Sequence, residues 1–150
     1  MQRVLQASVT IDDQLYSEIG KGYLLLVGFE EGDTADILPE MARKVVELRI
    51  GEDENGKMNL SIKDTGGEIL SVSQFTLYAD CRKGRRPSFV KAAQPEVATV
   101  LYDKFNEELN KQGVTVRTGV FQADMKVGLI NDGPVTIVMD SEDIIKNGGK

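Results

Sequence analysis

The sequence feature that most constrains the fold is the unbroken apolar run of residues 23–29, YLLLVGF. A strand with one face in water alternates apolar and polar residues, whereas a strand buried on both faces reads as a continuous apolar run. The run therefore predicts an inner strand of a sheet that is covered on both sides. At 150 residues, the chain is long enough to form one domain with such a core.

Two amphipathic helices are predicted on the outside of this sheet. The first begins at about residue 36, because Pro39 is tolerated only in the first turn of a helix. Its apolar residues recur at helical spacing, at Ile37, Leu38, Met41, Val45 and Leu48. The second begins at Pro95 and is expected to stop at Gly113. Its apolar stripe comprises Val97, Leu101, Phe105 and Leu109.

Shorter segments of the chain read as strands joined by turns. Asp12-Asp13, Glu54-Asn55-Gly56 and residues 64–67 are turn-like. Strands are expected at residues 7–11, 57–62, 68–77, 114–117, 125–130 and 135–140. This order predicts a mixed α/β fold, in which a barrel-like or strongly curved, mostly antiparallel sheet carries two main helices on its outside. Residues 1–141 are interpreted as one domain, followed by a polar tail, residues 142–150, that is expected to fray.

The absence of some residue types restricts the chemistry. The chain has no histidine and one cysteine, Cys81, which excludes Ser-His-Asp and Cys-His catalysis and zinc sites built on His and Cys. Hydrolytic chemistry is then left to hydroxyls, carboxylates, lysines, backbone dipoles, a carboxylate-bound metal or a group on the substrate. A lone cysteine fits a reducing compartment, and no apolar run approaches the ~20 residues that span a bilayer. We therefore expect a cytoplasmic protein with no membrane partner.

The charge distribution is uneven. The formal net charge is −6, yet Arg82, Lys83, Arg85 and Arg86 place four cations within five residues. A cluster of this kind can hold phosphates locally while the rest of the surface repels them. Taken alone, the cluster favours a solvated basic loop.

Polar residues in the expected strand 68–77 form the first candidate site. Ser73, Gln74 and Thr76 lie among apolar neighbours, and buried polar groups need hydrogen-bond partners. The pattern also fits a half-exposed strand with one polar face. Its position favours function, because the strand leads directly into the basic cluster.

The second candidate is the segment of residues 131–136, NDGPVT, which reads as a tight turn between strands. A Gly-Pro bond such as Gly133-Pro134 can adopt the cis form at little cost. Because Gly133 lacks a side chain, the tip of the turn can also approach another molecule closely.

Residues 73–80, SQFTLYAD, and residues 131–136 resemble the two signature motifs of the D-aminoacyl-tRNA deacylases. The similarity runs from residue 2 to about residue 141 and includes residues 56–61, 84–89 and 123–125. It implies a homodimer with active sites at the subunit interface, no metal or organic cofactor, and the 3′ end of aminoacyl-tRNA as the substrate. Two positions depart from the family pattern: Gly51 replaces the usual aromatic residue, and Gln122 replaces the usual glycine.

The resemblance also assigns roles to residues. Ser73, Gln74, Phe75 and Thr76 would line the catalytic pocket for the terminal adenosine and the ester. A cis Gly133-Pro134 would enter the pocket of the other subunit, hold the substrate amino group and leave no room for an L side chain. Glycine has no side chain to exclude, so glycyl-tRNA mischarged on tRNA-Ala would also be accepted. Met125 would border the pocket, Arg3 would support the turn, and Arg82, Lys83, Arg85 and Arg86 would bind tRNA phosphates.

The resemblance also implies a mechanism that needs no histidine, in which the 2′-hydroxyl of the terminal ribose assists the attacking water and backbone N–H groups stabilise the oxyanion. Thr76 as a covalent nucleophile is the rival mechanism, and the sequence offers no evident base beside it. Two other classes of function stay open: an RNA- or nucleotide-binding module without catalysis, and a small metal-free esterase acting on other substrates.

Overall fold

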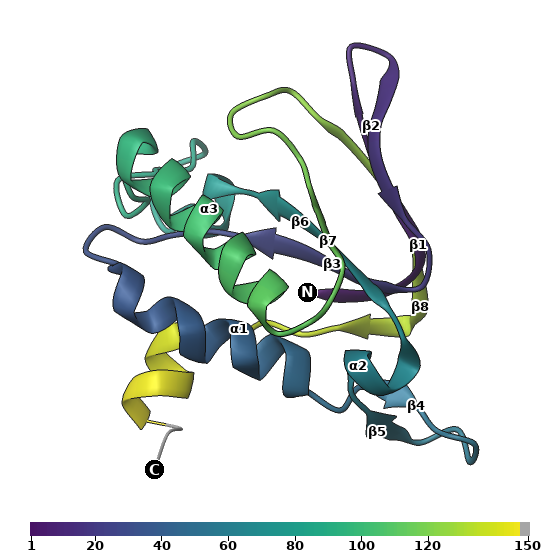
Figure 1. Cartoon of the computed structure of the whole chain (residues 1–150). Helices are drawn as coiled ribbons and strands as arrows, with labels where there is room; N and C mark the ends of the chain where they lie inside the picture. The colour runs from purple at the N-terminus through teal and green to yellow at the C-terminus, as the bar shows by residue number, and fades with distance from the viewer. Residues whose placement is uncertain (148–150) are drawn as a thin grey trace.

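A computed structural model of the chain describes residues 1–147, which form a six-stranded mixed sheet, a two-stranded hairpin and helices (Figure 1). The main sheet is built from strands of both halves of the chain: β1 (Gln2–Ile11), β2 (Gln14–Ile19), β3 (Gly22–Val27), β6 (Glu68–Ser73), β7 (Val116–Thr118) and β8 (Lys126–Thr136). The separate hairpin pairs β4 (Gly51–Glu52) with β5 (Met58–Leu60).

Strand β1 organises the sheet. It pairs antiparallel with β2 and β3 along one edge and with β8 along the other, while β3, β6 and β7 run parallel to one another. The hydroxyl of Ser17 in β2 donates to the carbonyl of Thr118 in β7 at 2.9 Å, which brings two distant strands of the sheet together. The sheet is therefore strongly curved and nearly closed, and the expected barrel-like mixed α/β architecture is confirmed.

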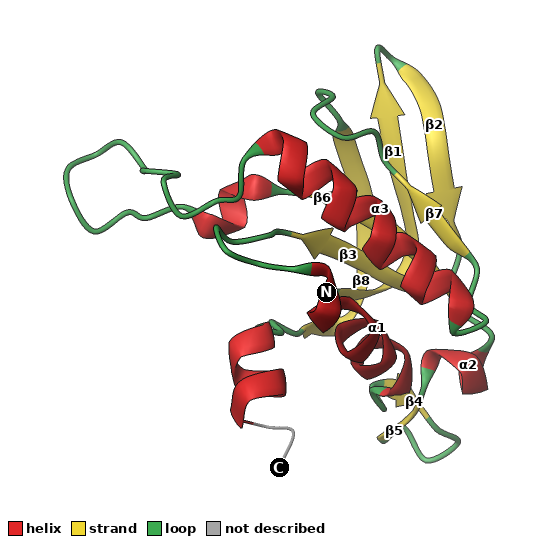
Figure 2. Cartoon of the chain, turned by 60° about the vertical axis from the view of Figure 1, so that its left-hand side comes forward, coloured by secondary structure: helices red, strands yellow, loops and turns green. Residues whose placement is uncertain are grey.

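Two helices, α1 (Leu38–Glu47) and α3 (Pro95–Lys111), lie on the outside of the sheet, as predicted (Figure 2). Both helices carry proline in the first turn. A short 3-10 segment, η1 (Ala35–Ile37), precedes α1, and Gly113 adopts a φ of 89° just after α3. One detail of the predicted stripe on α3 is wrong: Val97 is 48% exposed, and burial along this face begins with Ala98 and Leu101.

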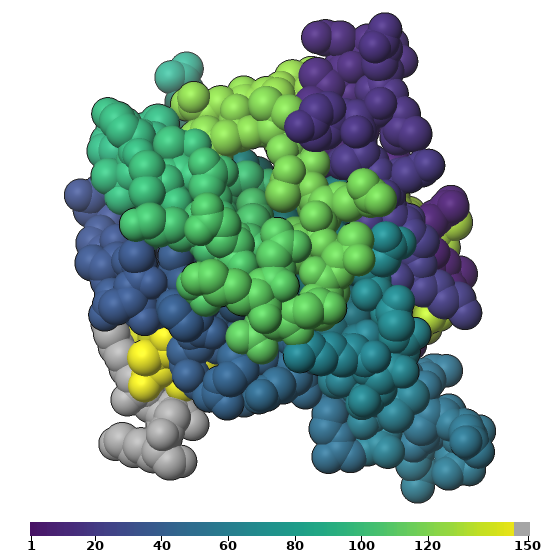
Figure 3. All heavy atoms as spheres, in the orientation of Figure 1, coloured from purple at the N-terminus to yellow at the C-terminus, as the bar shows by residue number. Residues whose placement is uncertain are grey.

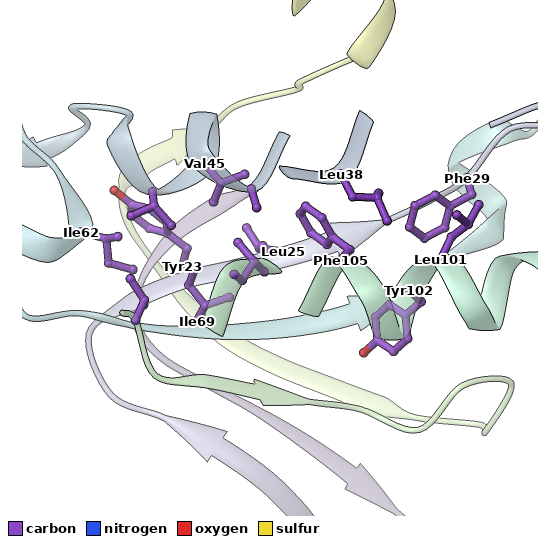
Figure 4. Close-up of a cluster of buried hydrophobic side chains, with 14 of the residues drawn as sticks. Tyr23, Leu25, Phe29, Leu38, Val45, Ile62, Ile69, Leu101, Tyr102 and Phe105 are labelled. Carbon is purple, nitrogen blue, oxygen red and sulfur yellow. The ribbon is translucent and has the colours of Figure 1, made fainter. Parts of the chain in front are cut away.

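The core has two layers, one on each face of the inner strands. Tyr23, Leu25 and Ile69 face the helices and pack with apolar side chains of α1 and α3, including Phe105 (Figure 4). Side chains on the opposite face belong to a second buried cluster: Val4, Ala7, Val9, Ile19, Leu24, Leu70 and Val72. The interpretation of residues 23–29 as a strand buried on both faces therefore holds for its strand portion, β3.

Several expected boundaries are corrected by the structure. The strand predicted for residues 68–77 ends at Ser73, and a 3-10 turn, η2 (Phe75–Tyr78), follows. Residue 62 begins a short helix, α2 (Ile62–Thr65), because Ser61 and Asp64 form a capping box. Strand β2 was not expected.

The end of the chain also differs from the expected pattern. Residues 135–140 are not a separate strand, since β8 continues through Thr136. Residues 142–147 form a helical segment, η3 (Glu142–Asn147), and residues 148–150 of the predicted tail lie outside the described residues. The fraying of this tail stays a prediction. No helix in residues 1–147 is long and apolar enough to cross a membrane.

Two hairpins project from the body. In space-filling form, the β1–β2 hairpin stands out at the top right and the β4–β5 hairpin at the lower right (Figure 3). Asp12 and Asp13 both adopt positive φ at the tip of the first hairpin, which confirms the predicted turn. In the second, Gly56 adopts a φ of 74°, as a tight turn at Asn55-Gly56 requires.

The segment 131–136 is an excursion within β8 rather than a turn between two strands. Asn131 pairs with Val4 and Thr136 pairs with Gln2, so the intervening residues 132–135 loop out of a ladder that resumes on the same partner strand. The side-chain amide of Asn131 closes this loop through hydrogen bonds to the backbone on its other side. Its Oδ1 accepts from the Val135 amide at 2.7 Å, and its Nδ2 donates to the Val135 carbonyl and to Gln2 Oε1, both at 3.0 Å.

Replacing Asn131 with alanine should loosen this loop, because it removes these three hydrogen bonds, together with a longer one of 3.4 Å to the Thr136 hydroxyl, and leaves the Val135 amide without its acceptor. Each such bond contributes about 1 kcal/mol, so we expect Asn131→Ala to lower the free energy of unfolding by about 1–3 kcal/mol. Urea unfolding measures the loss, with the exposed Asn110→Ala on α3 as control. Equal stability of the two variants would show that the loop does not depend on Asn131.

Candidate functional site

The carboxyl ends of the three parallel strands meet at one edge of the sheet and border a cavity. In open α/β sheets, ligands bind in the crevice beyond the carboxyl ends of parallel strands. Here β3 continues into Gly28 and Phe29, β6 into Gln74, and β7 into the loop of residues 119–125. Residues from all three continuations, with the first turn of α3, line a cavity of about 880 Å³.

Gln74 joins the motif segment to the sheet. Its backbone N–H donates to the Val27 carbonyl at 2.8 Å, which extends the β3–β6 ladder by one bond before the chain turns into η2. Its side-chain Nε2 donates to the Thr76 hydroxyl at 3.0 Å. The backbone N–H groups of Phe75 and Thr76 have no hydrogen-bond partner within residues 1–147. Ser73, Gln74, Phe75 and Thr76 all line the cavity, so both residues with free backbone donors belong to its wall.

Met125 and Gln122, from the loop that follows β7, also line the cavity. A Cβ on Gly119 would lie 2.5 Å from the Met125 sulfur, so the absence of a side chain at Gly119 lets Met125 pack against the backbone there. Gln122 adopts a φ of +66°, a conformation that L side chains rarely adopt, and its exposed side chain has no partner in the described part of the chain. The departure at Gln122 thus falls on the cavity wall, whereas Gly51 lies in β4.

Arg3 supports the Gly133-Pro134 turn, whose peptide bond is cis. The buried guanidinium donates to the Asp132 carbonyl at 2.9 Å and to the Ile50 carbonyl at 2.7 Å, and Glu52 lies 3.5 Å away. There is no room for a side chain on Gly133. A Cβ there would lie 2.7 Å from Val135 Cγ2 and 3.2 Å from Arg3 Nη2.

The predicted catalytic and substrate-binding residues fall into two groups within one chain. Ser73, Gln74, Phe75, Thr76 and Met125 line the cavity. Gly133, Pro134 and Arg3 do not, and both residues of the Gly-Pro pair are exposed. Sequence reasoning missed Phe89 and Phe121, which also line the cavity. Phe89 carries no periodic signal, although it lies close to the basic cluster in the sequence.

The basic cluster occupies a long loop between η2 and α3 that extends away from the body (Figure 2). Asp80 and Ser88 close its base with two backbone hydrogen bonds of 2.7 and 2.9 Å. Arg82 folds back on Asp80, with contacts of 2.9 and 2.7 Å between the guanidinium and the two carboxylate oxygens. This guanidinium holds the pKa of the Asp80 carboxyl well below its usual range.

The four cations of the loop therefore differ in availability. Lys83, Arg85 and Arg86 are exposed and have no partner among residues 1–147, whereas Arg82 is already paired with Asp80. Three cations are free to meet an anion.

A second cavity, of about 340 Å³, lies between β3, α1 and residues 136–141. Tyr78 lines it, and burial raises the pKa of Tyr78 to about 12, with the carboxylates of Asp33, Asp140 and Glu30 adding to the shift. None of the predicted site residues lines this cavity. Residues 1–147 contain no group of three or more Cys, Asp or Glu side chains arranged to hold a metal ion.

The chain matches known proteins over almost its full length. The family model for D-Tyr-tRNA(Tyr) deacylase matches residues 1–140. A D-aminoacyl-tRNA deacylase of Bacillus cytotoxicus is 55% identical over 142 residues, which cover 95% of this chain and 97% of that protein. A D-aminoacyl-tRNA deacylase of Parabacteroides distasonis is 56% identical over 142 residues, covering 94% and 95%.

A solved structure of a protein named c-Myc DNA Unwinding Element Binding Protein has the same fold, with a TM-score of 0.84 and 44% sequence identity. The likeness covers 91% of this chain and 93% of that one. The agreement of family match, relatives and fold leads to one conclusion: this chain belongs to the D-Tyr-tRNA(Tyr) deacylase family.

Proposed function

We propose that this protein hydrolyses the ester bond of D-aminoacyl-tRNA and so releases the free D-amino acid and tRNA. The observation that carries the proposal is the position of Ser73, Gln74, Phe75 and Thr76 at one cavity, in a chain that is 55% identical to a D-aminoacyl-tRNA deacylase. Such a reaction removes D-amino acids before they reach translation. We infer a cytoplasmic protein, because aminoacyl-tRNA is used in the cytoplasm.

The active protein is a homodimer in this proposal, with each site shared between two subunits. The Gly133-Pro134 turn does not line the cavity of its own chain, although the family resemblance implies that such a turn enters a catalytic pocket. A second copy can supply the missing turn. Exposed apolar side chains on β1 and β8 offer a surface for this contact: Leu5 (42%), Leu129 (36%) and Ile130 (48%).

Selection by chirality follows from the same arrangement. Backbone carbonyls of the inserted Gly133-Pro134 turn hold the substrate amino group, and the turn leaves no room for an L side chain. Arg3 and Asn131 keep the turn rigid enough to exclude an L side chain, since they bind the backbone of the turn at both of its ends. Because glycine has no side chain to exclude, glycyl-tRNA mischarged on tRNA-Ala is a second substrate.

The chemistry uses backbone groups and the substrate itself. Water attacks the ester carbonyl carbon, with the 2′-hydroxyl of the terminal ribose assisting removal of its proton. The N–H groups of Phe75 and Thr76 donate to the oxyanion, and such preorganised donors contribute about 3–4 kcal/mol each. The bond between the carbonyl carbon and the ribose oxygen then breaks, and that oxygen takes up a proton. Thr76 is a positioning group, because its hydroxyl faces an amide donor, Gln74, and not a base.

A nucleic-acid-binding role without catalysis is the second candidate. It is favoured by the three unpaired cations of the basic loop and by the 44% identity to a protein whose name describes DNA binding. The net charge of −6 confines any such binding to the face that carries this loop.

Release of D-tyrosine from D-tyrosyl-tRNA tests the proposed function directly. We expect fast hydrolysis of the D-ester, while L-tyrosyl-tRNA decays at its spontaneous rate. Equal hydrolysis of both esters would indicate a general esterase. Binding of tRNA without hydrolysis of either would indicate a binding module.

Complementation between two inactive variants tests the shared site. Gly133→Val disrupts the turn, because any Cβ there meets Val135 and Arg3, and Ala123→Trp fills the cavity. Each variant alone should be inactive. After co-refolding, half of the dimers are mixed and each has one intact site, so activity should return to about a quarter of the wild-type value. No recovery, with mixed dimers demonstrated by sedimentation of tagged subunits, would contradict a shared site.

The basic loop should bind tRNA phosphates. We expect Arg85→Ala with Arg86→Ala to raise KM for D-tyrosyl-tRNA and to reduce the slope of log K against log salt by about 1.5, as the loss of two phosphate contacts implies. Lys104→Ala, an exposed cation on α3, is the control and should leave the slope unchanged. An unaltered slope in the double variant would show that the two arginines are solvated and contact no phosphate.

A further inference from the structure

We propose that Phe75 and Phe89 form a stacking platform for an unpaired base next to the terminal adenosine of the tRNA, with Lys83, Arg85 and Arg86 holding the neighbouring phosphates. This inference rests on the proposed function and extends it from the terminal nucleotide to the single-stranded 3′ end. It assigns Phe89 a role that neither sequence motif includes.

The aromatic pair is the first observation. Phe75 and Phe89 meet edge to face, with ring centroids 5.1 Å apart and an interplanar angle of 69°. Both rings line the cavity, yet they stay 58% and 37% exposed. Two large apolar rings held together at the rim of a cavity leave ring surface in water that a planar partner can cover.

The second observation is the position of the loop cations relative to these rings. The backbone hydrogen bonds between Asp80 and Ser88 close the loop at its base, and Phe89 follows Ser88 directly. Phe89 thus lies where the loop rejoins the body, while the free cations Lys83, Arg85 and Arg86 lie farther out. A single-stranded RNA that leaves the cavity would pass the two phenylalanine rings first and the loop cations next.

Single-stranded nucleic acid is the partner that this combination fits. Proteins that bind it combine aromatic side chains, on which successive bases stack, with cations that follow the backbone. A duplex would offer its phosphates to the cations but no free base face to the rings. The loop is positively charged, whereas the chain as a whole has a net charge of −6. A polyanion is therefore attracted to the loop and repelled by the rest of the surface.

Truncation of the substrate separates this role from binding of the terminal nucleoside. The experiment measures kcat/KM for D-tyrosyl-tRNA and for 3′-O-D-tyrosyl-adenosine, which lacks all preceding nucleotides. For Phe89→Leu, we expect the ratio of the two values, tRNA over adenosine ester, to fall about five- to 150-fold, the effect of losing one stacked base. Phe89→Tyr keeps the ring and should preserve the ratio.

The control is Tyr16→Leu, which removes an exposed ring from the distant β2 strand and should leave the ratio unchanged. An unchanged ratio in Phe89→Leu would overturn the inference, as would a shift of that variant from dimer to monomer, since the rings would then cover a second copy of the chain. Wild-type protein that hydrolyses neither substrate would instead overturn the proposed function, and this inference with it.

Discussion

The parallel pairing of β3 with β6 is the constraint on which the site depends. It places Val27 beside Ser73, and the Gln74 amide then makes one more bond to the Val27 carbonyl before the backbone leaves the sheet. Because β7 adds to the same parallel group, three chain segments emerge together at one edge. The cavity exists between these emerging segments, and its polar groups come from backbone that has just left a ladder. Buried apolar side chains on both faces of β3 and β6 hold that edge in place.

In the proposed function, the two regions of the chain that carry the site residues have different tasks. The wall of the cavity includes Phe75 and Thr76, whose backbone N–H groups are free, together with apolar residues. The Gly133-Pro134 turn presents backbone and almost no side chain, and it is braced by Arg3 from within and by Asn131 across its neck. A group that recognises by exclusion must be rigid, whereas a group that stabilises charge must be close and correctly aimed. Separate elements meet these two demands better than one element would.

Patterns that depend on local periodicity were predictable from the sequence. The apolar run of residues 23–29 and the stripes of α1 and α3 reflect burial, which the fold preserves. The break after Ser73 was not predictable, because residues 73–77 alternate in the manner of a strand. The pairing of β6 ends at Ser73 because its neighbour β3 ends at Val27, and the sequence of β6 does not reveal this. The continuity of β8 was hidden for a similar reason, since residues on both sides of the loop pair with β1, which is far away in sequence. The motif residues of the site were found by resemblance, while Phe89 required the fold of the basic loop to bring it beside Phe75.

The register of β8 against β1 has an evolutionary consequence. Between the pairs Val4 with Asn131 and Gln2 with Thr136, β8 has three more residues than β1. The spacing from Asn131 to Thr136 lets the Asn131 side chain reach the Val135 backbone across the loop, so adding or deleting a residue there would separate these groups and strain the pairing of Thr136 with Gln2. The loop can therefore drift in composition wherever backbone alone is needed, but its length is fixed by the ladder on both sides. Insertions and deletions should accumulate elsewhere, such as in the turn of the β4–β5 hairpin, because no further strand pairing fixes the length of that turn.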